Sequence, residues 1–160
     1  MTIKPLTVEN VFEFAEVIRQ SFATVAQEFG FTKENCHGYI GFITDERLES
    51  KFENENCCPF GVFVDERMIG CVALTNSDES VFEMSTLSVL PAYRHFSYGT
   101  ALINFCREKV KEFSGNKIII SIVEENTVLK DWYVKNGFIH TGTKNIDGLP
   151  FVVGYMERLT

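Results

Sequence analysis

The 160-residue sequence has few of the features that mark membrane, metal-binding or nucleic-acid-binding proteins. No run approaches the ~20 apolar residues that a membrane-spanning helix needs, and acidic residues interrupt the first apolar segment, so no signal peptide is predicted. The five cysteines have neither CxxC nor Cys/His metal spacing, which argues against a metal site. The odd number of cysteines fits free thiols in a reducing cytoplasm. The net charge is −7 and no lysine/arginine cluster is present, so a nucleic-acid partner is not expected.

The composition is that of a compact globular protein. Hydrophobic residues make up 45% and charged residues 23%, which is ordinary for such proteins, and we predict one domain over residues 1–160. Fifteen phenylalanines against one tryptophan indicate an interior rich in aromatic rings. The negative charge would attract a cationic substrate such as an amine, although a charge that only serves solubility explains it equally well.

Hydrophobic periodicity predicts an α/β chain in the order β-α-α-β-β-β-α-β-α-β-β. Glycine and polar turn residues separate these elements. We expect strands at 3–6, 60–64, 68–74, 80–90, 117–123, 138–144 and 151–158. Helices are expected at 8–29, with Thr7 as its cap, and at 44–52, 101–113 and 127–135. The vicinal pair Cys57-Cys58 is expected in a loop before Pro59, where the thiols could be reactive or could have only a structural or incidental role.

The segment between residues 85 and 105 is the most informative for function. An apolar run ends at Pro91, Arg94 follows, and a polar loop, Ser97 to Thr100, opens an amphipathic helix. The first amides of a helix have no internal partners and carry partial positive charge, so such a loop can hold phosphates. We therefore predict a site for the pyrophosphate of a nucleotide-like cofactor. The segment is neither a P-loop nor a dinucleotide fingerprint, because both glycine patterns are absent.

This segment resembles motif A of the GNAT superfamily, the acyl-CoA-dependent N-acyltransferases. The motif reads L-x-V-x-P-x-x-[RQ]-x-x-G-x-[GA], and the matching residues are Leu87, Val89, Pro91, Arg94 and Gly99. Ser97 stands where the family usually has glycine. A left-handed conformation at a serine costs roughly 1–2 kcal/mol, which a loop can bear.

A second segment resembles the other signature of the same family, N-x6-Y-x-x-x-G-F. Here the matching residues are Asn126, Tyr133, Gly137 and Phe138. They follow a β-branched run at 118–123 that is typical of a buried central strand. The two matches lie in the family's order and together cover residues 81 to 138.

The resemblance implies a fold, a reaction and a coenzyme. The fold would be a central mixed, twisted sheet of about seven strands flanked by four helices. The reaction would be transfer of an acetyl group from acetyl-CoA to an amine by direct attack in a ternary complex, without a metal. The coenzyme would lie between strands 80–90 and 117–123, which splay apart. Its expected ligands are the backbone of Leu87, Ser88 and Val89, the loop residues Arg94, His95, Phe96, Ser97, Tyr98, Gly99 and Thr100, and the side chain of Asn126.

The resemblance also implies catalytic residues. Tyr133 would face the sulfur and act as general acid, and Glu83 is the candidate general base, acting through a water molecule. Tyr133 can also be read as a core aromatic, and Glu83 as a solvent-facing strand residue. Glu124 and Glu125 are weaker candidates for the base. The three histidines, His37, His95 and His140, are expected to be surface or packing residues.

The acceptor is expected to be the amine of a small molecule or a peptide, chosen by the segments 22–58 and 140–160. Phe31, Tyr39 and Phe42 suggest an apolar wall there. Two other readings stay open: an acyl-CoA-binding module that has lost catalysis and acts as sensor or interaction partner, and an unrelated α/β fold. No membrane partner is expected, and the expected location is the cytoplasm. Homodimers are common in the family, but no feature of this sequence establishes one.

Overall fold

We describe the protein from a computed structural model that covers residues 1–160. In chain order the elements are β1 (Thr2–Pro5), α1 (Val11–Phe29), α2 (Asp45–Phe52), β2 (Cys57–Val64), β3 (Arg67–Asp78), β4 (Val81–Val89), α3 (Tyr98–Glu112), β5 (Lys117–Val123), α4 (Thr127–Lys135), β6 (Ile139–Asn145) and β7 (Val152–Leu159). Single 3-10 turns lie at Val8–Asn10, Ile40–Phe42 and Pro91–Tyr93. The predicted element order is confirmed, as are the α/β class, the seven strands and the four helices.

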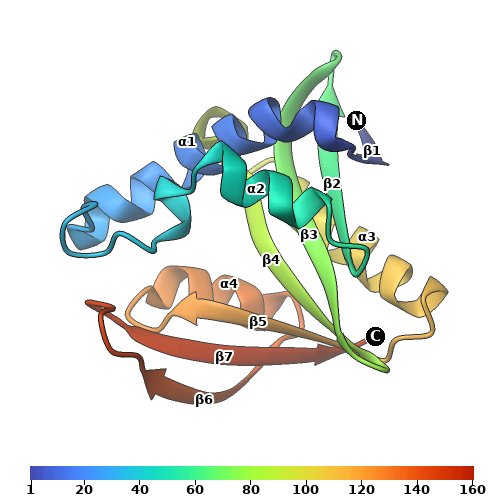
Figure 1. Ribbon diagram of the computed structural model, residues 1–160. Coiled ribbons are helices and arrows are strands. Elements are labelled where there is room, and N and C mark those ends of the chain that lie inside the picture. The colour runs from blue at the N-terminus through green and yellow to red at the C-terminus, as the bar shows by residue number, and fades with distance from the viewer.

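The seven strands form one sheet in the order β1-β2-β3-β4-β5-β7-β6. The β4–β5 pair is parallel and every other neighbouring pair is antiparallel. The sheet is strongly twisted, so that β2, β3 and β4 run steeply through the view of Figure 1 while β5, β7 and β6 lie across it. The parallel pair therefore stands at the junction of the two halves of the sheet.

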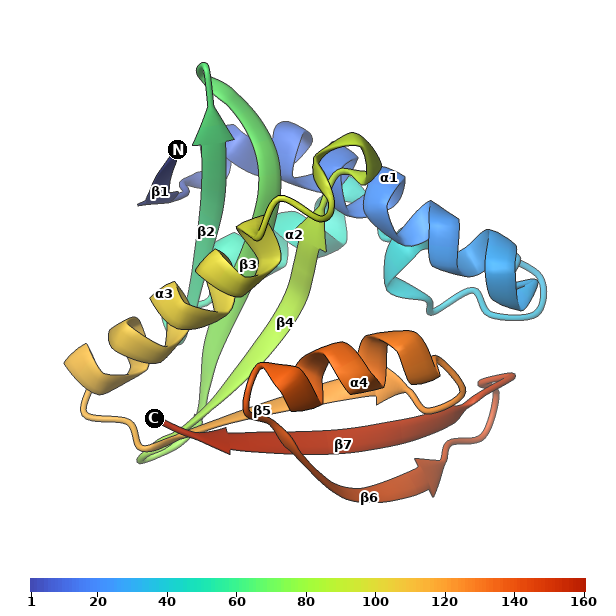
Figure 2. The same cartoon turned by 180° about the vertical axis from the view of Figure 1, so that it is seen from behind.

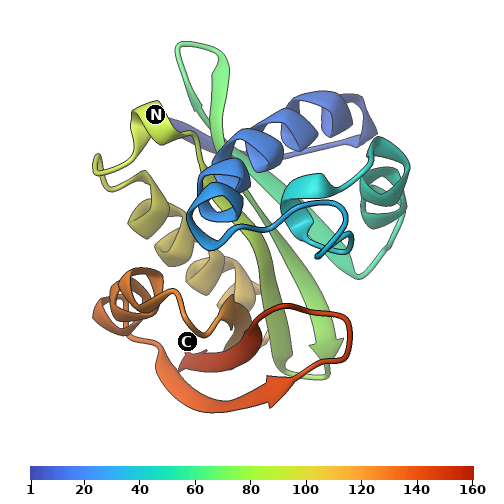
Figure 3. The same cartoon turned by 90° about the vertical axis from the view of Figure 1, so that its left-hand side faces the viewer.

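The helices cover the two faces of this sheet in pairs. Helices α1 and α2 lie on one face and α3 and α4 on the other, as the side view shows (Figure 3). Each pair buries its own part of the core. The larger cluster lies beneath α3 and α4 and includes Leu102, Cys106, Tyr133 and Phe138. The second cluster lies beneath α1 and α2, around Phe14 and Leu48 among others.

The local sequence explains where the helices begin and end. Gly30 ends α1 in the left-handed conformation, with φ of 69°, which glycine adopts without steric cost. The side chain of Thr44 caps α2 by accepting a hydrogen bond from the amide of Arg47. Asn126 caps α4 in the same way through the amide of Leu129. No helix is both long and apolar enough to cross a bilayer.

The parallel strands β4 and β5 separate soon after they meet. Their pairing is confined to Val81–Glu83 of β4 and Lys117–Ile119 of β5, and beyond these residues the two ribbons diverge (Figures 1 and 2). The upper part of each strand consequently has an edge whose amides and carbonyls have no neighbouring strand. We call the space between these two edges the splay.

A β-bulge at Thr86 re-aims the side chains of β4 beside the splay. Thr86 has a φ of 55°, and the register with β3 shifts at this point. Before the bulge, Phe82 and Met84 pack in the cluster beneath α3, and after it Leu87 and Val89 pack against the same cluster. The bulge thus keeps apolar side chains on the α3 face along the whole strand.

The structure corrects the expectation for the vicinal cysteines. Cys57 and Cys58 do not lie in a loop but begin β2, pairing with Thr75 and Leu74 of β3. Cys57 is buried, and burial raises the pKa of the Cys58 thiol. The raised pKa lowers the thiolate fraction of Cys58, and burial shields Cys57 from solvent, so neither position has the character of a reactive cysteine.

The strand β5 also differs from the prediction of a wholly buried strand. Ile118, Ile120 and Ile122 are buried on the α4 side, whereas Ser121 is exposed. The reason is the splay: once β4 has moved away, the α1–α2 face of β5 is no longer covered by neighbouring elements. The polar residue in the β-branched run marks this open face.

Candidate active site

The loop that joins β4 to α3 presents a row of free backbone amides. His95 and Ser97 both adopt the left-handed conformation, with φ of 68° and 64°, and α3 begins at Tyr98. No amide from His95 to Thr100 donates a hydrogen bond to the protein. Six consecutive unpartnered amides at a helix N-terminus form an anion-binding concavity. Ser97 thus adopts the left-handed conformation that glycine would take without strain, at a cost of roughly 1–2 kcal/mol.

The sole tryptophan of the chain forms a wall beside this loop. Trp132 lies on α4, and a Cβ placed on Gly99 would come within 3.0 Å of its Cζ2 atom. Glycine at this position lets the indole ring close against the first turn of α3. The side chain of Trp132 therefore reaches from α4 to the first turn of α3, where the free amides lie.

Arg94 is placed differently from the expectation that it would meet a pyrophosphate. Its guanidinium donates to the carbonyls of Val89 and Ser21 and to the hydroxyl of Thr24, at 3.3, 2.8 and 3.0 Å. Its backbone amide donates to the carbonyl of Pro91. Burial lowers the pKa of Arg94. The side chain thus ties the loop to α1, and its donors are used inside the protein.

The upper edge of β4 offers backbone groups to the splay. The amide of Leu90 donates to Ile69 of β3, and Ser88 pairs with Cys71. Alternation along an antiparallel strand then turns the amides of Leu87 and Val89 away from β3 and toward the splay. Ser88, also expected to bind the coenzyme, points its backbone to β3 instead, and its hydroxyl donates to the carbonyl of Thr86.

Tyr133 is both a core residue and a candidate acid. Its ring is buried, with edge-on contacts to Trp132 and Phe138 at centroid distances of 4.9 and 5.3 Å. Its hydroxyl makes no hydrogen bond to the protein. The two fully buried side-chain oxygens without a partner are those of Ser21 and Thr86, so the Tyr133 hydroxyl reaches accessible space. Burial raises the pKa of Tyr133, which keeps the hydroxyl protonated and able to donate.

Asn126 lies just beyond the end of β5, as the N-cap of α4, on the other edge of the splay. It is 8% exposed, and its Oδ1 accepts the amide hydrogen of Leu129 at 3.1 Å. Its Nδ2 makes no hydrogen bond in the structure and can donate to a ligand. Capping of α4 thus fixes the orientation of this side-chain amide.

Glu83 lies on the opposite face of the sheet from Tyr133. It pairs across β3 with Thr75 and across β5 with Ile119, so it sits on the last row before the strands separate. Its carboxylate is half-buried and has neither a hydrogen bond nor an ion pair. The two candidate catalytic residues therefore flank the splay, Tyr133 from the α4 side and Glu83 from the α1–α2 side.

Other titratable residues near the site are engaged in the structure. Glu124 binds Lys130 of α4 and His140 of β6, the latter at 2.9 Å between Oε2 and Nε2. Glu125 accepts the amide of Val152 at 3.1 Å. His37 and His95 are exposed. The spacing of Glu124, Lys130 and His140 in the sequence carries no signal for this cluster, because three separate elements bring them together.

The Glu124 cluster predicts how stability depends on pH. The hydrogen bond from Lys130, and then that from His140, hold the pKa of Glu124 below its usual value. A carboxylate with a depressed pKa contributes stability above its unfolded pKa and loses that contribution as the pH falls through the folded one. We expect Glu124→Gln to lower the Tm at pH 7, and the difference from wild type to shrink as the pH falls below the usual pKa of a glutamate, measured by thermal melts from pH 7 to pH 3.

The control for this prediction is Glu49→Gln, which changes an exposed carboxylate on α2 that forms no ion pair. We expect its melting curves to follow wild type at every pH. A Glu124→Gln protein with an unchanged Tm at pH 7 would show that the cluster adds nothing to stability.

An aromatic cluster closes the far end of the splay on the α1–α2 face. The ring of Phe31 lies 5.1 Å from Tyr39 and 5.1 Å from Phe151, and Tyr39 lies 5.6 Å from Phe42. Val123, at the end of β5, packs against the same cluster. Phe31, Tyr39 and Phe42 are thus brought together, with Phe31 and Tyr39 buried in the cluster, and its role as a wall of the acceptor site stays a prediction. The sequence pattern gave no sign of Phe151, which joins it from the loop before β7.

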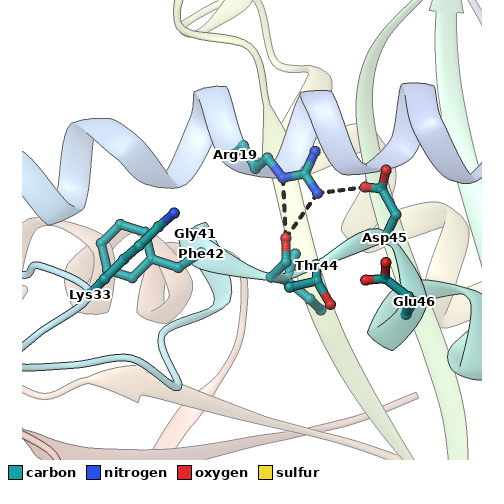
Figure 4. A pocket seen from close by; sticks show the side chains of 8 residues that line it. Arg19, Lys33, Gly41, Phe42, Thr44, Asp45 and Glu46 are labelled. Carbon is teal, nitrogen blue, oxygen red and sulfur yellow. Dashed lines mark hydrogen bonds and ion pairs between the residues drawn. The ribbon is translucent and has the colours of Figure 1, made fainter.

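A pocket of about 370 Å³ lies beside this wall, between α1 and the start of α2 (Figure 4). Arg19 reaches across it, donating to the carbonyl of Ile43 at 2.9 Å and to Asp45 at 2.5 Å. The guanidinium is used for these contacts, so the arginine fixes the start of α2 against α1. Lys33, Phe42 and Glu46 line the remaining sides.

Comparison with known proteins agrees with this geometry. The sequence model described as the Acetyltransferase (GNAT) family matches residues 23–138. An uncharacterized N-acetyltransferase of Schizosaccharomyces pombe is 31% identical over 71 residues. That match covers 44% of this chain and 49% of the yeast protein, so the chain matches about half the length of this relative.

Solved structures share the whole fold. The PaiA N-acetyltransferase of Thermoplasma acidophilum, in complex with coenzyme A, superimposes with a TM-score of 0.80 at 23% identity, covering 100% of both chains. A probable acetyltransferase of Staphylococcus epidermidis gives 0.81 at 15% identity, covering 99% of this chain and 98% of the other. An aminoglycoside 6'-N-acetyltransferase complexed with coenzyme A gives 0.73 at 16% identity, covering 99% and 97%. The chain belongs to the GNAT family of acetyltransferases.

Proposed function

We propose that the protein is an N-acetyltransferase that moves an acetyl group from acetyl-CoA to a primary amine of a small molecule or peptide. The observation that carries this proposal is the row of six unpartnered amides, residues 95 to 100, beside the splay of β4 and β5. Such a row binds a pyrophosphate without any basic side chain. Two relatives of the same fold, the PaiA and aminoglycoside enzymes, were crystallised with coenzyme A.

The coenzyme would lie with its pyrophosphate on these amides and its pantetheine arm along the open edge of β4. The free amides of Leu87 and Val89 would bind the arm as a neighbouring strand would. The Nδ2 of Asn126 would donate from the other side of the splay. The thioester would then lie between β4 and β5, where Tyr133 and Glu83 approach from opposite faces of the sheet.

This arrangement suits direct attack by an amine, which must lose a proton while the departing thiolate gains one. The hydroxyl of Tyr133 would donate a proton to the thiolate, and its free, protonated state supports that role. The carboxylate of Glu83 would receive the proton of the amine through a water molecule. No nucleophilic side chain of the protein is needed, in keeping with the inert, buried Cys71 and Cys106.

Calorimetric titration of the protein with acetyl-CoA, coenzyme A, pantetheine and ATP tests the proposal. We expect micromolar dissociation constants for acetyl-CoA and coenzyme A, and much weaker binding of pantetheine, which lacks the pyrophosphate. The fluorescence of Trp132 gives a second readout, because this sole tryptophan contacts Gly99 in the phosphate loop. Absence of binding by both methods would refute the proposal.

A second step separates an enzyme from a binding module. The protein is incubated with acetyl-CoA and a panel of amines, and release of the free thiol is followed. We expect turnover with at least one amine. Tight binding of acetyl-CoA with no turnover on any amine would favour the inactive module.

The single domain over residues 1–160, the cytoplasmic location and a homodimer stay predictions.

A further inference from the structure

Two opposite charges without partners lie near one another on the α1–α2 face of the sheet. Glu83 and Ser85 are two residues apart on β4, so they point to the same face. The intervening Met84 packs beneath α3 on the other face. From α2, Lys51 reaches down to this surface, where its Nζ donates to the hydroxyl of Ser85 at 3.4 Å.

Neither charge is neutralised by the protein. Lys51 takes part in none of the ion pairs of the structure, and neither does Glu83. Both side chains are half-buried. A partly buried charge costs free energy unless it is paired and hydrogen-bonded, and the long Ser85 contact compensates little of this for Lys51. The surface is thus complementary to a ligand that carries both an ammonium and an anionic group.

The two charges lie on the face of the sheet opposite the proposed coenzyme site, where the second substrate would approach. The free amides of the loop before α3 lie on the other face of the sheet, with α3 and α4 (Figures 2 and 3). A second substrate must therefore reach the thioester from the face of α1 and α2. Glu83 stands at the foot of the splay on that face, and Lys51 stands beside it.

We propose that Lys51 and Ser85 hold an anionic group of the acceptor while its amine turns toward Glu83. The inference rests on the proposed acetyltransferase function and specifies its substrate class: an amine that also carries a carboxylate or a phosphate-like group. Opposite charges at the two ends would orient such an acceptor. A polyamine would instead place a cation near Lys51, and this repulsion discriminates against it.

Matched acceptors test this class directly. Each amino acid with a primary amine and an uncharged side chain is compared with its own amide, which keeps the amine but has no negative charge. Aminoalkylphosphonates are compared with aminoalkylcarboxylates of equal length. We expect kcat/KM to be at least roughly 10-fold higher for the acid than for the amide, because an interaction with a charged group is lost. The phosphonate series shows whether the anion is a carboxylate or a phosphate.

Variants then assign the effect to Lys51. Lys51→Met keeps the length and removes the charge, and we expect it to abolish the preference for the acid through KM. Lys51→Arg keeps the charge and should retain most of the preference, while Ser85→Ala should weaken it. Lys4→Met, on the exposed edge strand β1 and outside both segments expected to choose the acceptor, is the control that should leave kinetics unchanged. Acetyl-CoA binding, followed by Trp132 fluorescence, should be the same in all four.

Three results would overturn the inference: equal rates for acids and amides, an acid preference that survives in Lys51→Met, or no turnover of any anionic amine. Each is separable from failure of the proposed function. If acetyl-CoA still binds and amines without a negative charge are acetylated, the protein is an acetyltransferase and only the substrate class is wrong. If acetyl-CoA does not bind, the proposed function fails as well.

Discussion

Tyr133→Phe is expected to lower kcat by about 10²-fold or more, the usual contribution of a positioned general acid, while acetyl-CoA binds as in wild type. The hydroxyl makes no hydrogen bond to the protein, so its removal leaves no protein group unsatisfied. The ring keeps its edge-on contacts with Trp132 and Phe138. The free energy of unfolding should therefore change by less than about 0.5 kcal/mol.

The structural reading of Tyr133 as a core aromatic predicts a different result. If the ring only fills the core, Tyr133→Phe should retain full activity, because phenylalanine fills nearly the same volume. Tyr93→Phe is the matched control: this half-buried tyrosine lies outside α4, and its hydroxyl makes no hydrogen bond either. Loss of activity in both variants would point to a general effect of tyrosine removal rather than to an acid at position 133.

The pH dependence of the reaction gives an independent check on the same residue. Burial raises the pKa of Tyr133 above its ordinary value, so the hydroxyl stays protonated to higher pH than a free tyrosine. An acid that stays protonated does not produce a basic limb in the rate profile. We expect kcat of the wild type not to fall as the pH rises from 7 to 9. A fall with a midpoint in this interval would contradict the assignment of Tyr133 as the acid.

The sequence predicts most of the fold because its signals are local. The stripe through Leu102, Cys106 and Val110 depends on helical spacing alone. The β-branched residues predict β5 with its observed bounds, and the closing Asn-Gly does the same for α4. The bulge at Thr86 could not be predicted in this way. Threonine rarely has a positive φ, and only the position of β4 between β3 and the splay imposes it.

The parts of the site that could not be predicted from the sequence depend on contacts between distant segments. Glu124 follows the end of β5, whereas Lys130 and His140 come from α4 and β6. Phe151 meets Phe31 across 120 residues of chain. The unpaired state of Lys51 is likewise visible only once α2 lies over β4. Motifs identified the loop and its free amides, whereas packing decided which side chains near it remain available to a ligand.

Arg94 is a residue that the motif identifies but whose contacts are decided by packing. The motif suggests a positive charge for the pyrophosphate, but the guanidinium donates its hydrogen bonds to Val89, Ser21 and Thr24. Arg94→Ala leaves these acceptors without their donors in a partly buried place. We expect the free energy of unfolding to fall by about 2–4 kcal/mol, since hydrogen bonds to a charged group contribute roughly 1.5–3 kcal/mol each and are not additive. Denaturant unfolding measures this change.

The variant Arg94→Lys separates an anchor from a phosphate ligand. Lysine keeps the charge but cannot reproduce the planar, three-point contact of arginine. If Arg94 anchors the loop to α1, Arg94→Lys should lose most of the stability that Arg94→Ala loses, and both should weaken acetyl-CoA binding only through a loosened loop. If Arg94 binds phosphate by its charge, Arg94→Lys should retain affinity, and Arg94→Ala should lose both affinity and its salt dependence. Arg47→Ala, an exposed arginine of α2 without an ion pair, should match wild type in both measurements. Because the backbone amides need no side-chain charge to bind an anion, we expect the first outcome.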